Sequence, residues 1–179
     1  MCSSDLLGSM TFGSDPGGPF ASTYKVDQAT ANDLVAAAID AGVNYFNSAD
    51  VYARGDSERI LGKAIGAKRQ QVVIATKVGN RMGPGLVQAG LSRRHLLTAA
   101  DASLERLGTD YIDVYLVHKV DALSPLEETL DALEHLVRAG KVRYVGFSNW
   151  PAWMAAKAVG LQRARGYEPF RAAEMYYSL

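Results

Sequence analysis

The sequence predicts a single α/β domain over residues 1–179, built as a (β/α)8 TIM barrel that is incomplete, with about six parallel strands and five helices. Apolar strand candidates begin at residues 43, 72, 112, 142 and 170, a spacing typical of repeated strand–helix units in a parallel sheet. Each candidate is a continuous apolar run, as expected for a sheet covered on both faces. Because a barrel needs eight units, we expect the last strand–helix units to be missing.

The strands are expected at residues 8–12, which is the weakest, and at 43–47, 72–76, 112–117, 142–147 and 170–175. Three helices between them carry their own end signals, with caps at Asp27, Ser92 and Ser124 and terminating glycines at Gly42, Gly108 and Gly140. After Ser124, Pro125 fits the first helical position and Glu127 completes a capping box. A doubly wound dinucleotide-binding sheet is the alternative, but the glycines after the first strand lack the G-x-G-x-x-G spacing.

Composition and charge exclude several classes of protein. Lys and Arg number 19, as do Asp and Glu, and this balance argues against a nucleic-acid or anionic-membrane partner. The one cysteine, Cys2, rules out an internal disulfide, and the three histidines lack the spacing of a zinc site. No window approaches the ~18 apolar residues of a membrane span, and the N-terminus lacks a secretory signal. We expect a cytoplasmic protein, treat residues 1–6 as non-native sequence, and leave a homo-oligomer open.

Polar residues stand at the ends of the predicted strands, where barrel enzymes keep their active sites. Singly, each has an ordinary explanation, such as a solvated lysine, a structural histidine or a packing tyrosine. Together they suggest proton donation to a carbonyl, because a tyrosine can donate, a nearby ammonium lowers its pKa of about 10, and a histidine can orient the oxygen. These strand-end residues are Asn47, Tyr52, Lys77, His118, Ser148, Asn149 and Glu174.

Several blocks in the right order make the sequence resemble the aldo-keto reductase superfamily. They are "GVNYFNSADVYARGDSERILGKAI", "VVIATKVG", "GLSRRHLLTAADASLERLGTDYIDVYLVH" and "GKVRYVGFSNW". The resemblance is closest to the bacterial branch related to the potassium-channel β-subunits. It implies an NADPH-dependent carbonyl reductase acting on a small-molecule aldehyde or ketone. NADH is not excluded, because the family's segments that bind the adenosine phosphate lie in the units expected to be missing.

The resemblance also implies roles for individual residues. Tyr52 corresponds to the family's proton donor, Lys77 to the residue that lowers its pKa, and His118 to the residue that orients the carbonyl. Ser148 and Asn149 correspond to the pair that holds the nicotinamide carboxamide. Two positions near the substrate pocket, Met82 in the loop 81–85 and Trp150, also match the family.

Two positions depart from the family pattern. Asn47 stands where the family usually has an aspartate paired with the catalytic lysine, so impaired or altered catalysis is expected. Glu174 stands where the family usually has a glutamine on the carboxamide, and its charge is expected to favour the oxidised nicotinamide. Two alternatives stay open: a cofactor-binding regulatory or inactive subunit, which Asn47 permits, and a Schiff-base aldolase acting through Lys77.

Overall fold

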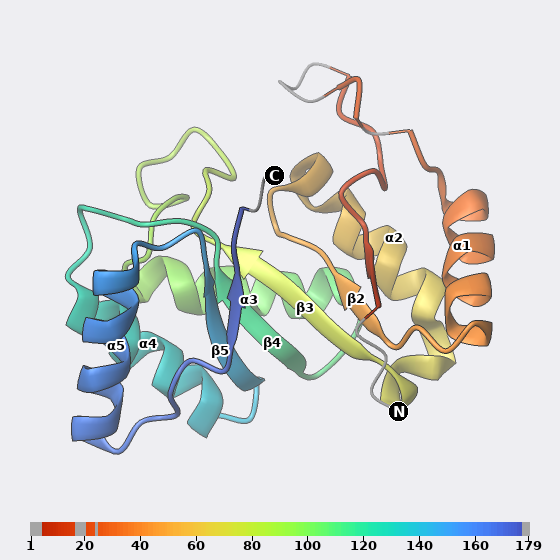
Figure 1. The fold of residues 1–179 in the computed structure, drawn as a ribbon. Helices are drawn as coiled ribbons and strands as arrows, with labels where there is room; N and C mark the ends of the chain where they lie inside the picture. The colour runs from red at the N-terminus through yellow and green to blue at the C-terminus, as the bar shows by residue number, and fades with distance from the viewer. Residues whose placement is uncertain (1–4, 17–20, 24, 177–179) are drawn as a thin grey trace.

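The computed structural model describes residues 5–16, 21–23 and 25–176, in which strands and α-helices alternate along the chain (Figure 1). The strands are β1 (Leu6–Gly8), β2 (Tyr45–Asn47), β3 (Val73–Val78), β4 (Ile112–Val117), β5 (Val142–Ser148) and β6 (Ala172–Glu174). The α-helices are α1 (Gln28–Asp40), α2 (Asp56–Ile65), α3 (Arg93–Leu107), α4 (Leu126–Arg138) and α5 (Ala152–Arg165). Two 3-10 helices flank α2, namely η1 (Tyr52–Gly55) and η2 (Gly66–Gln71).

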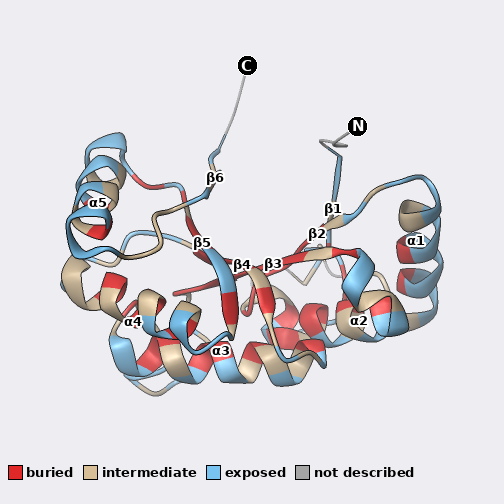
Figure 2. Cartoon of the chain, turned by 90° about the horizontal axis from the view of Figure 1, so that it is seen from below, coloured by how far each residue is buried: buried red, intermediate tan, exposed pale blue. Residues whose placement is uncertain are grey.

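The six strands form one parallel sheet whose order in space follows the order in the chain, from β1 to β6. Figure 2 shows this sheet curled into a trough, with the helices arranged around its outer side and the edge strands β1 and β6 standing apart at its open side. The prediction of an incomplete (β/α)8 barrel with six parallel strands and five helices is therefore confirmed.

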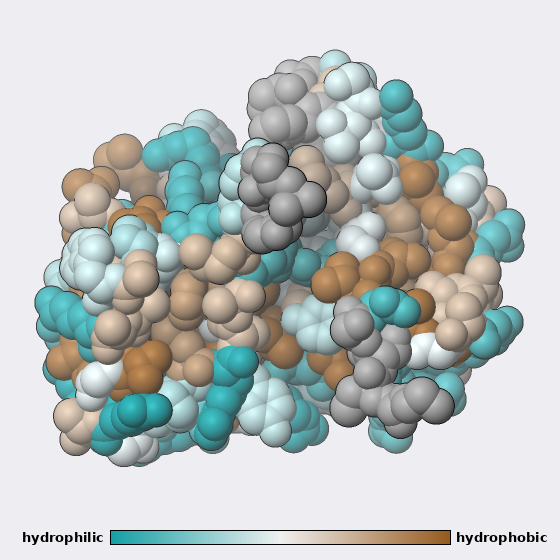
Figure 3. All heavy atoms as spheres, viewed as in Figure 1, coloured by the Kyte–Doolittle hydropathy of each residue, from teal (hydrophilic) through white to brown (hydrophobic). Residues whose placement is uncertain are grey.

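Successive side chains of a strand point to opposite faces of the sheet, so alternate residues face the inside of the trough. Residues in register on neighbouring strands share a face. Figures 1 and 3 look into the open side of the trough, and Figure 3 shows apolar side chains lying there among polar ones. Leu6 and Tyr144 remain 54% and 51% exposed on this side. Also facing inward are Tyr45 and Asn47 of β2, Val73, Ala75 and Lys77 of β3, Val114 and Leu116 of β4, Gly146 and Ser148 of β5, and Ala172 and Glu174 of β6.

The main hydrophobic core lies between the outer face of the sheet and the helices. Outward-facing strand residues such as Phe46, Ile74 and Tyr115 are fully buried there, and they pack with leucines such as Leu61 and Leu133 from the helices. Figure 2 shows buried residues along the sheet and on the helix sides that face it. This helix-covered core fixes the strands, so the rim at their carboxyl ends is a rigid platform.

The prediction of a strand at residues 8–12 was wrong in position. The strand is β1 (Leu6–Gly8), so Leu6, which was assigned to non-native sequence, belongs to the sheet. The chain turns directly afterwards, where the Phe12 amide donates to the Ser9 carbonyl oxygen at 2.9 Å. Phe12 is 1% exposed, so its apolar side chain fills the core without belonging to the sheet. Residues 1–4 lie outside the described residues.

The capping box predicted at Ser124 was also wrong. Asp27 and Ser92 cap α1 and α3 as predicted, with their side-chain oxygens accepting from the Thr30 and His95 amides. Ser124 instead donates its hydroxyl to Asp121 Oδ2 at 2.7 Å. Helix α4 begins one residue later than predicted, at Leu126, with Pro125 as the capping residue. The Ser124 hydroxyl is therefore bound to the preceding loop, and no side-chain hydrogen bond caps α4.

A buried ion pair ties α2 to α3. Glu58 is completely buried and accepts from Arg106 Nε at 2.6 Å, while its other carboxylate oxygen accepts from the Thr76 hydroxyl at 2.5 Å. Arg106 Nη2 also donates to Ser103 Oγ at 3.0 Å. Since Thr76 belongs to β3, this network links both helices to the strand that carries Lys77.

Candidate active site

The carboxyl ends of the strands bring most of the predicted site residues to one rim, as the topology requires. Asn47 ends β2, Ser148 ends β5 and Glu174 ends β6. Lys77 is the penultimate residue of β3, and His118 directly follows β4. The site therefore draws on strands separated by up to 127 residues in sequence.

Lys77 lies at the centre of this group and is only 1% exposed. Its Nζ donates to Asn47 Oδ1 at 2.7 Å and to the Ser48 carbonyl oxygen at 3.1 Å. It also forms an ion pair with Glu174, with 3.3 Å between Nζ and Oε1. Burial lowers the pKa of Lys77, and the Glu174 carboxylate opposes that shift.

Tyr52 lies beside both Lys77 and His118. Its ring centroid is 5.2 Å from Lys77 Nζ and 5.9 Å from the centre of the His118 ring, which it meets edge-on at 84°. The turn that presents it is strained, because Ala53 and Arg54 adopt φ angles of 46° and 53° in the left-handed region. Such strain persists where surrounding structure enforces it, and functional sites are common among those places.

His118 is positioned by Asn80, a residue that the sequence analysis did not select. The two side chains meet with 2.9 Å between Asn80 Nδ2 and His118 Nδ1. An amide nitrogen only donates, so Nδ1 accepts and the ring proton of a neutral imidazole resides on Nε2. Burial, helped by Lys77 and Lys119, lowers the pKa of His118 to about 4. His118 is therefore a neutral hydrogen-bond donor at neutral pH.

A cleft of about 780 Å³ opens beside Tyr52 and His118. This volume falls within the range of small-molecule sites. Met82, predicted at the substrate pocket, lines the cleft as part of the loop after β3. The lining residues are Met10, Asp15, Val51, Tyr52, Arg54, Asn80, Arg81, Met82, Gly83, Pro84, His118 and Lys119.

Trp150, the other residue predicted at the substrate pocket, is not brought to this cleft. It is 1% exposed and stacks on Phe147 with 5.7 Å between ring centroids. It also meets Phe170 edge-on at 5.5 Å. Trp150 therefore packs the start of α5 against β5, and its indole Nε1 has no hydrogen-bond partner there.

Ser148, Asn149 and Glu174 form a polar group at the ends of β5 and β6, where Ser148 and Glu174 are register partners. Asn149 Nδ2 donates to Ser148 Oγ at 3.1 Å, and the Asn149 amide donates to the Glu174 carbonyl oxygen at 3.0 Å. Asn149 Oδ1 accepts from the Tyr176 amide at 2.7 Å. Since Ser148 Oγ accepts from Asn149, its hydroxyl hydrogen is left to donate to another group.

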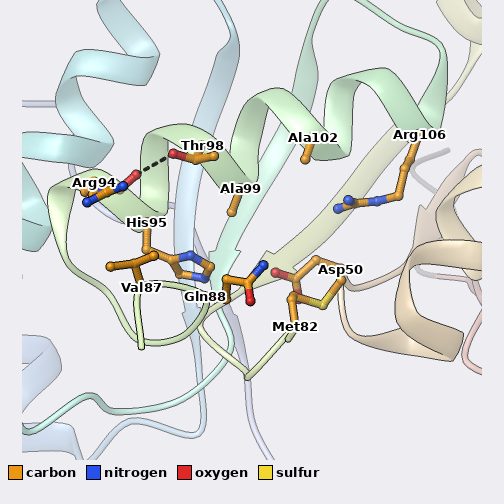
Figure 4. A pocket seen from close by; sticks show the side chains of 10 residues that line it. All are labelled: Asp50, Met82, Val87, Gln88, Arg94, His95, Thr98, Ala99, Ala102 and Arg106. Atoms are coloured by element: carbon orange, nitrogen blue, oxygen red, sulfur yellow. Dashed lines mark hydrogen bonds between the residues drawn. The ribbon is translucent and has the colours of Figure 1, made fainter. Parts of the chain in front are cut away.

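A second cavity of about 350 Å³ lies between α3 and the loop after β3, and Met82 lines both it and the cleft. Figure 4 shows Asp50, Gln88 and His95 turned toward this space, with Arg106 reaching in from the end of α3. Asp50 is 1% exposed, and neither of its carboxylate oxygens has a hydrogen-bond partner. Burial, reinforced by Glu58, raises the pKa of Asp50 to about 8.

The raised pKa of Asp50 predicts a pH-dependent stability. In the unfolded chain this carboxyl ionises near its model value of 3.8, whereas in the folded chain it holds its proton until about pH 8. Stability should therefore fall as the pH rises from 6 to 8, by about 2 kcal/mol, and then level off. Replacing Asp50 with Asn should remove this fall, which thermal unfolding over pH 6–9 would measure.

The exposed Asp40 provides the matched control, since Asp40→Asn should keep the wild-type pH dependence. Parallel loss of melting temperature with pH in the wild type and in Asp50→Asn would contradict the assignment to Asp50.

In residues 5–16, 21–23 and 25–176, no group of three or more His, Cys, Asp and Glu side chains is placed to hold a metal ion. Within the same ranges, no helix combines the length and apolar character needed to cross a membrane.

Comparison with known proteins identifies the family. The model of the aldo/keto reductase family matches residues 6–179. Aldo-keto reductase dtxS3 of Metarhizium robertsii is 36% identical, with the match covering 97% of this chain and 53% of that protein. The probable voltage-gated potassium channel subunit beta of Arabidopsis thaliana is 40% identical over 76% of this chain and 42% of its own length. The L-glyceraldehyde 3-phosphate reductase of Escherichia coli is 39% identical, with the match covering 70% of this chain and 38% of that protein.

The chain spans about half the length of the curated relatives it matches. The match nevertheless runs through every strand of the sheet and every residue of the polar cluster at the strand ends. Reductases are among the relatives that the chain matches. The chain belongs to the aldo/keto reductase family.

Proposed function

We propose that the protein is an NADPH-dependent carbonyl reductase that reduces a small-molecule aldehyde or ketone to an alcohol, with Tyr52 as the proton donor. The observation that carries the proposal is the convergence of Tyr52, Lys77 and His118, with 5.2 Å from Lys77 Nζ to the Tyr52 ring and 5.9 Å between the Tyr52 and His118 rings. Tyr52 and His118 line the cleft, and Lys77 is buried behind them. These three groups supply what carbonyl reduction asks of a protein: a proton, a charge that eases its release, and a hydrogen bond to the oxygen.

Each of the three residues has a distinct task in this proposal. Neutral His118 donates from Nε2 to the substrate oxygen and holds the carbonyl in place, which its lowered pKa permits. Tyr52 gives its phenolic proton to that oxygen as negative charge develops there. The Lys77 ammonium, beside the ring, favours the phenolate that remains on Tyr52. Reduced nicotinamide, when bound, supplies the hydride.

Ser148, Asn149 and Glu174 fit the carboxamide of a nicotinamide. A carboxamide offers one carbonyl oxygen and one NH2 group, so its site needs a donor and an acceptor. The Ser148 hydroxyl has a hydrogen left to give, and the Glu174 carboxylate accepts. We propose that these residues hold the carboxamide and that Met82 contacts the substrate in the cleft. NADH is the alternative to NADPH.

Turnover with a generic aldehyde tests the proposal. Oxidation of NADPH, followed by its absorbance, should require both the protein and the aldehyde, and equimolar alcohol should form. The same assay with NADH measures the cofactor preference. Absence of aldehyde-dependent oxidation with either cofactor would contradict the proposal.

A second candidate is a regulatory subunit that binds the cofactor without turning it over. It is favoured by Asn47 at the position of the family's usual aspartate and by the relatives named as potassium channel subunits beta. Tight NADPH binding, measured by quenching of its fluorescence, together with no aldehyde-dependent oxidation would support this candidate. A Schiff-base role for Lys77 is disfavoured, because its Nζ is held by three oxygen atoms in a buried site.

A further inference from the structure

Lys77 is a buried amine, and a buried ammonium needs a countercharge to remain protonated. Two of the three oxygens around its Nζ are uncharged: the amide oxygen of Asn47 at 2.7 Å and the carbonyl oxygen of Ser48 at 3.1 Å. The third belongs to Glu174, whose Oε1 is 3.3 Å away. Glu174 is therefore the carboxylate that pairs with Lys77 in the part of the chain that the structure describes.

Asn47 connects the other two side chains. Its Oδ1 accepts from Lys77, while its Nδ2 donates to Glu174 Oε2 at 2.9 Å. One amide thus satisfies the ammonium on one side and the carboxylate on the other, which only a group with both an acceptor and a donor can do. The three side chains meet inside the trough, although β2 and β6 lie four positions apart in the order of the sheet.

This arrangement explains why an amide and a carboxylate stand at these two positions. An aspartate at position 47 would place a carboxylate oxygen about where Nδ2 now lies, facing Glu174 Oε2 across a distance close to 2.9 Å. Two carboxylates that close cannot both ionise, so one would hold a proton or move away. The negative charge therefore comes from position 174 and the bridging amide from position 47.

We propose that Glu174 is a positioning residue that keeps Lys77 in its ammonium form, with Asn47 as the bridge between the two side chains. The proposal deepens the proposed function, on which its kinetic consequence rests. Lys77 acts on Tyr52 through its charge, so Glu174 acts on Tyr52 through Lys77. Other titratable groups also face this cluster: Tyr45 of β2 near Glu174, Tyr52, and His118 after β4. Asp5, just before β1, lines a pocket together with Asn47 and Glu174.

The ionisation of Lys77 tests the proposal without any assay of activity. The Cε resonance of 13C-labelled lysine, assigned with a Lys77→Arg variant, reports its pKa by NMR titration. Glu174→Gln removes the charge and should lower the pH at which Lys77 titrates by about one unit or more. Asn47→Asp together with Glu174→Gln exchanges the two groups and should restore the titration to within about half a unit of the wild type.

Glu168 gives the matched control, because it lies before β6 and outside the cluster. Its carboxylate pairs with Arg171, with 2.7 Å between Glu168 Oε1 and Arg171 Nε. Glu168→Gln should leave the titration of Lys77 unchanged. An unchanged titration in Glu174→Gln, or no restoration in the exchanged variant, would overturn the proposal. If Glu174→Gln does not fold, the exchanged variant decides, since a folded chain supports the proposal and an unfolded one contradicts it.

The pH dependence of carbonyl reduction gives the kinetic arm of the test. The alkaline fall in kcat/KM should move to lower pH in Glu174→Gln and should return to the wild-type pH in the exchanged variant. A change that only loosened the structure would instead lower the rate at every pH. Asn47→Asp alone should not raise the rate. If the wild type reduces no carbonyl, the proposed function fails while the NMR titration still decides the role of Glu174.

Discussion

Replacing Tyr52 with Phe is expected to lower kcat/KM for carbonyl reduction by about 10²- to 10⁴-fold, because positioned proton donors contribute this much to catalysis. The substitution removes the phenolic proton and keeps the ring that lies 5.2 Å from Lys77 and 5.9 Å from His118. Cofactor affinity should change little, because the residues proposed for the carboxamide belong to β5 and β6 or directly follow β5. Steady-state kinetics and titration of NADPH fluorescence measure the two quantities.

Tyr167→Phe is the matched control. The Tyr167 hydroxyl donates to Asp131 Oδ1 at 3.0 Å beside α4 and α5, away from the cluster at the strand ends. This variant should keep wild-type kcat/KM even if it loses some stability. Equal activity of Tyr52→Phe and the wild type would mean that another group donates the proton.

Replacing Arg106 with Met is expected to cost about 3–5 kcal/mol of unfolding free energy, because it leaves the fully buried Glu58 carboxylate without its countercharge. The double variant Glu58→Gln, Arg106→Met should recover part of this loss, since no unpaired charge then remains buried. Denaturant unfolding measures all three free energies.

The pair of Arg138 with Glu134, in which the arginine is exposed, gives the comparison. In both pairs, 2.6 Å separates the arginine Nε from a glutamate carboxylate oxygen. The Arg138 side chain is 68% exposed, whereas the Arg106 side chain is 13% exposed. Arg138→Met should therefore cost no more than about 1 kcal/mol. Equal costs for the two arginines would show that burial does not govern the strength of the Glu58 pair.

The fold was predictable because its signals are local. Continuous apolar runs at regular spacing marked the long buried strands, and β4 (Ile112–Val117) has the bounds that the sequence indicated. A local signal failed at Ser124, whose hydroxyl donates to Asp121 in the preceding loop and does not cap α4. The first strand was misplaced because Phe12 is apolar and buried in the core but does not belong to a strand of the sheet.

The site was predictable as a set of strand ends but not as a network of contacts. The rule that selected Lys77 applies equally to Asn80, two residues after β3, yet its bond to His118 depends on how two loops meet. The bridge from Asn47 to Glu174 spans 127 residues and depends on the curl of the sheet. Trp150 follows the site residues in sequence but turns into the core, which no local pattern distinguishes.

Transfer of deuterium from NADPH labelled at C4 of the nicotinamide tests the central claim most directly. We expect the protein, given an aldehyde and the labelled cofactor in the appropriate C4 configuration, to form an alcohol with one deuterium on the former carbonyl carbon. Mass spectrometry of the product detects it, and both C4 configurations are tried because the transferred face is not assumed. An alcohol without deuterium from either configuration, or no alcohol at all, would contradict carbonyl reduction at the cluster of Tyr52, Lys77 and His118.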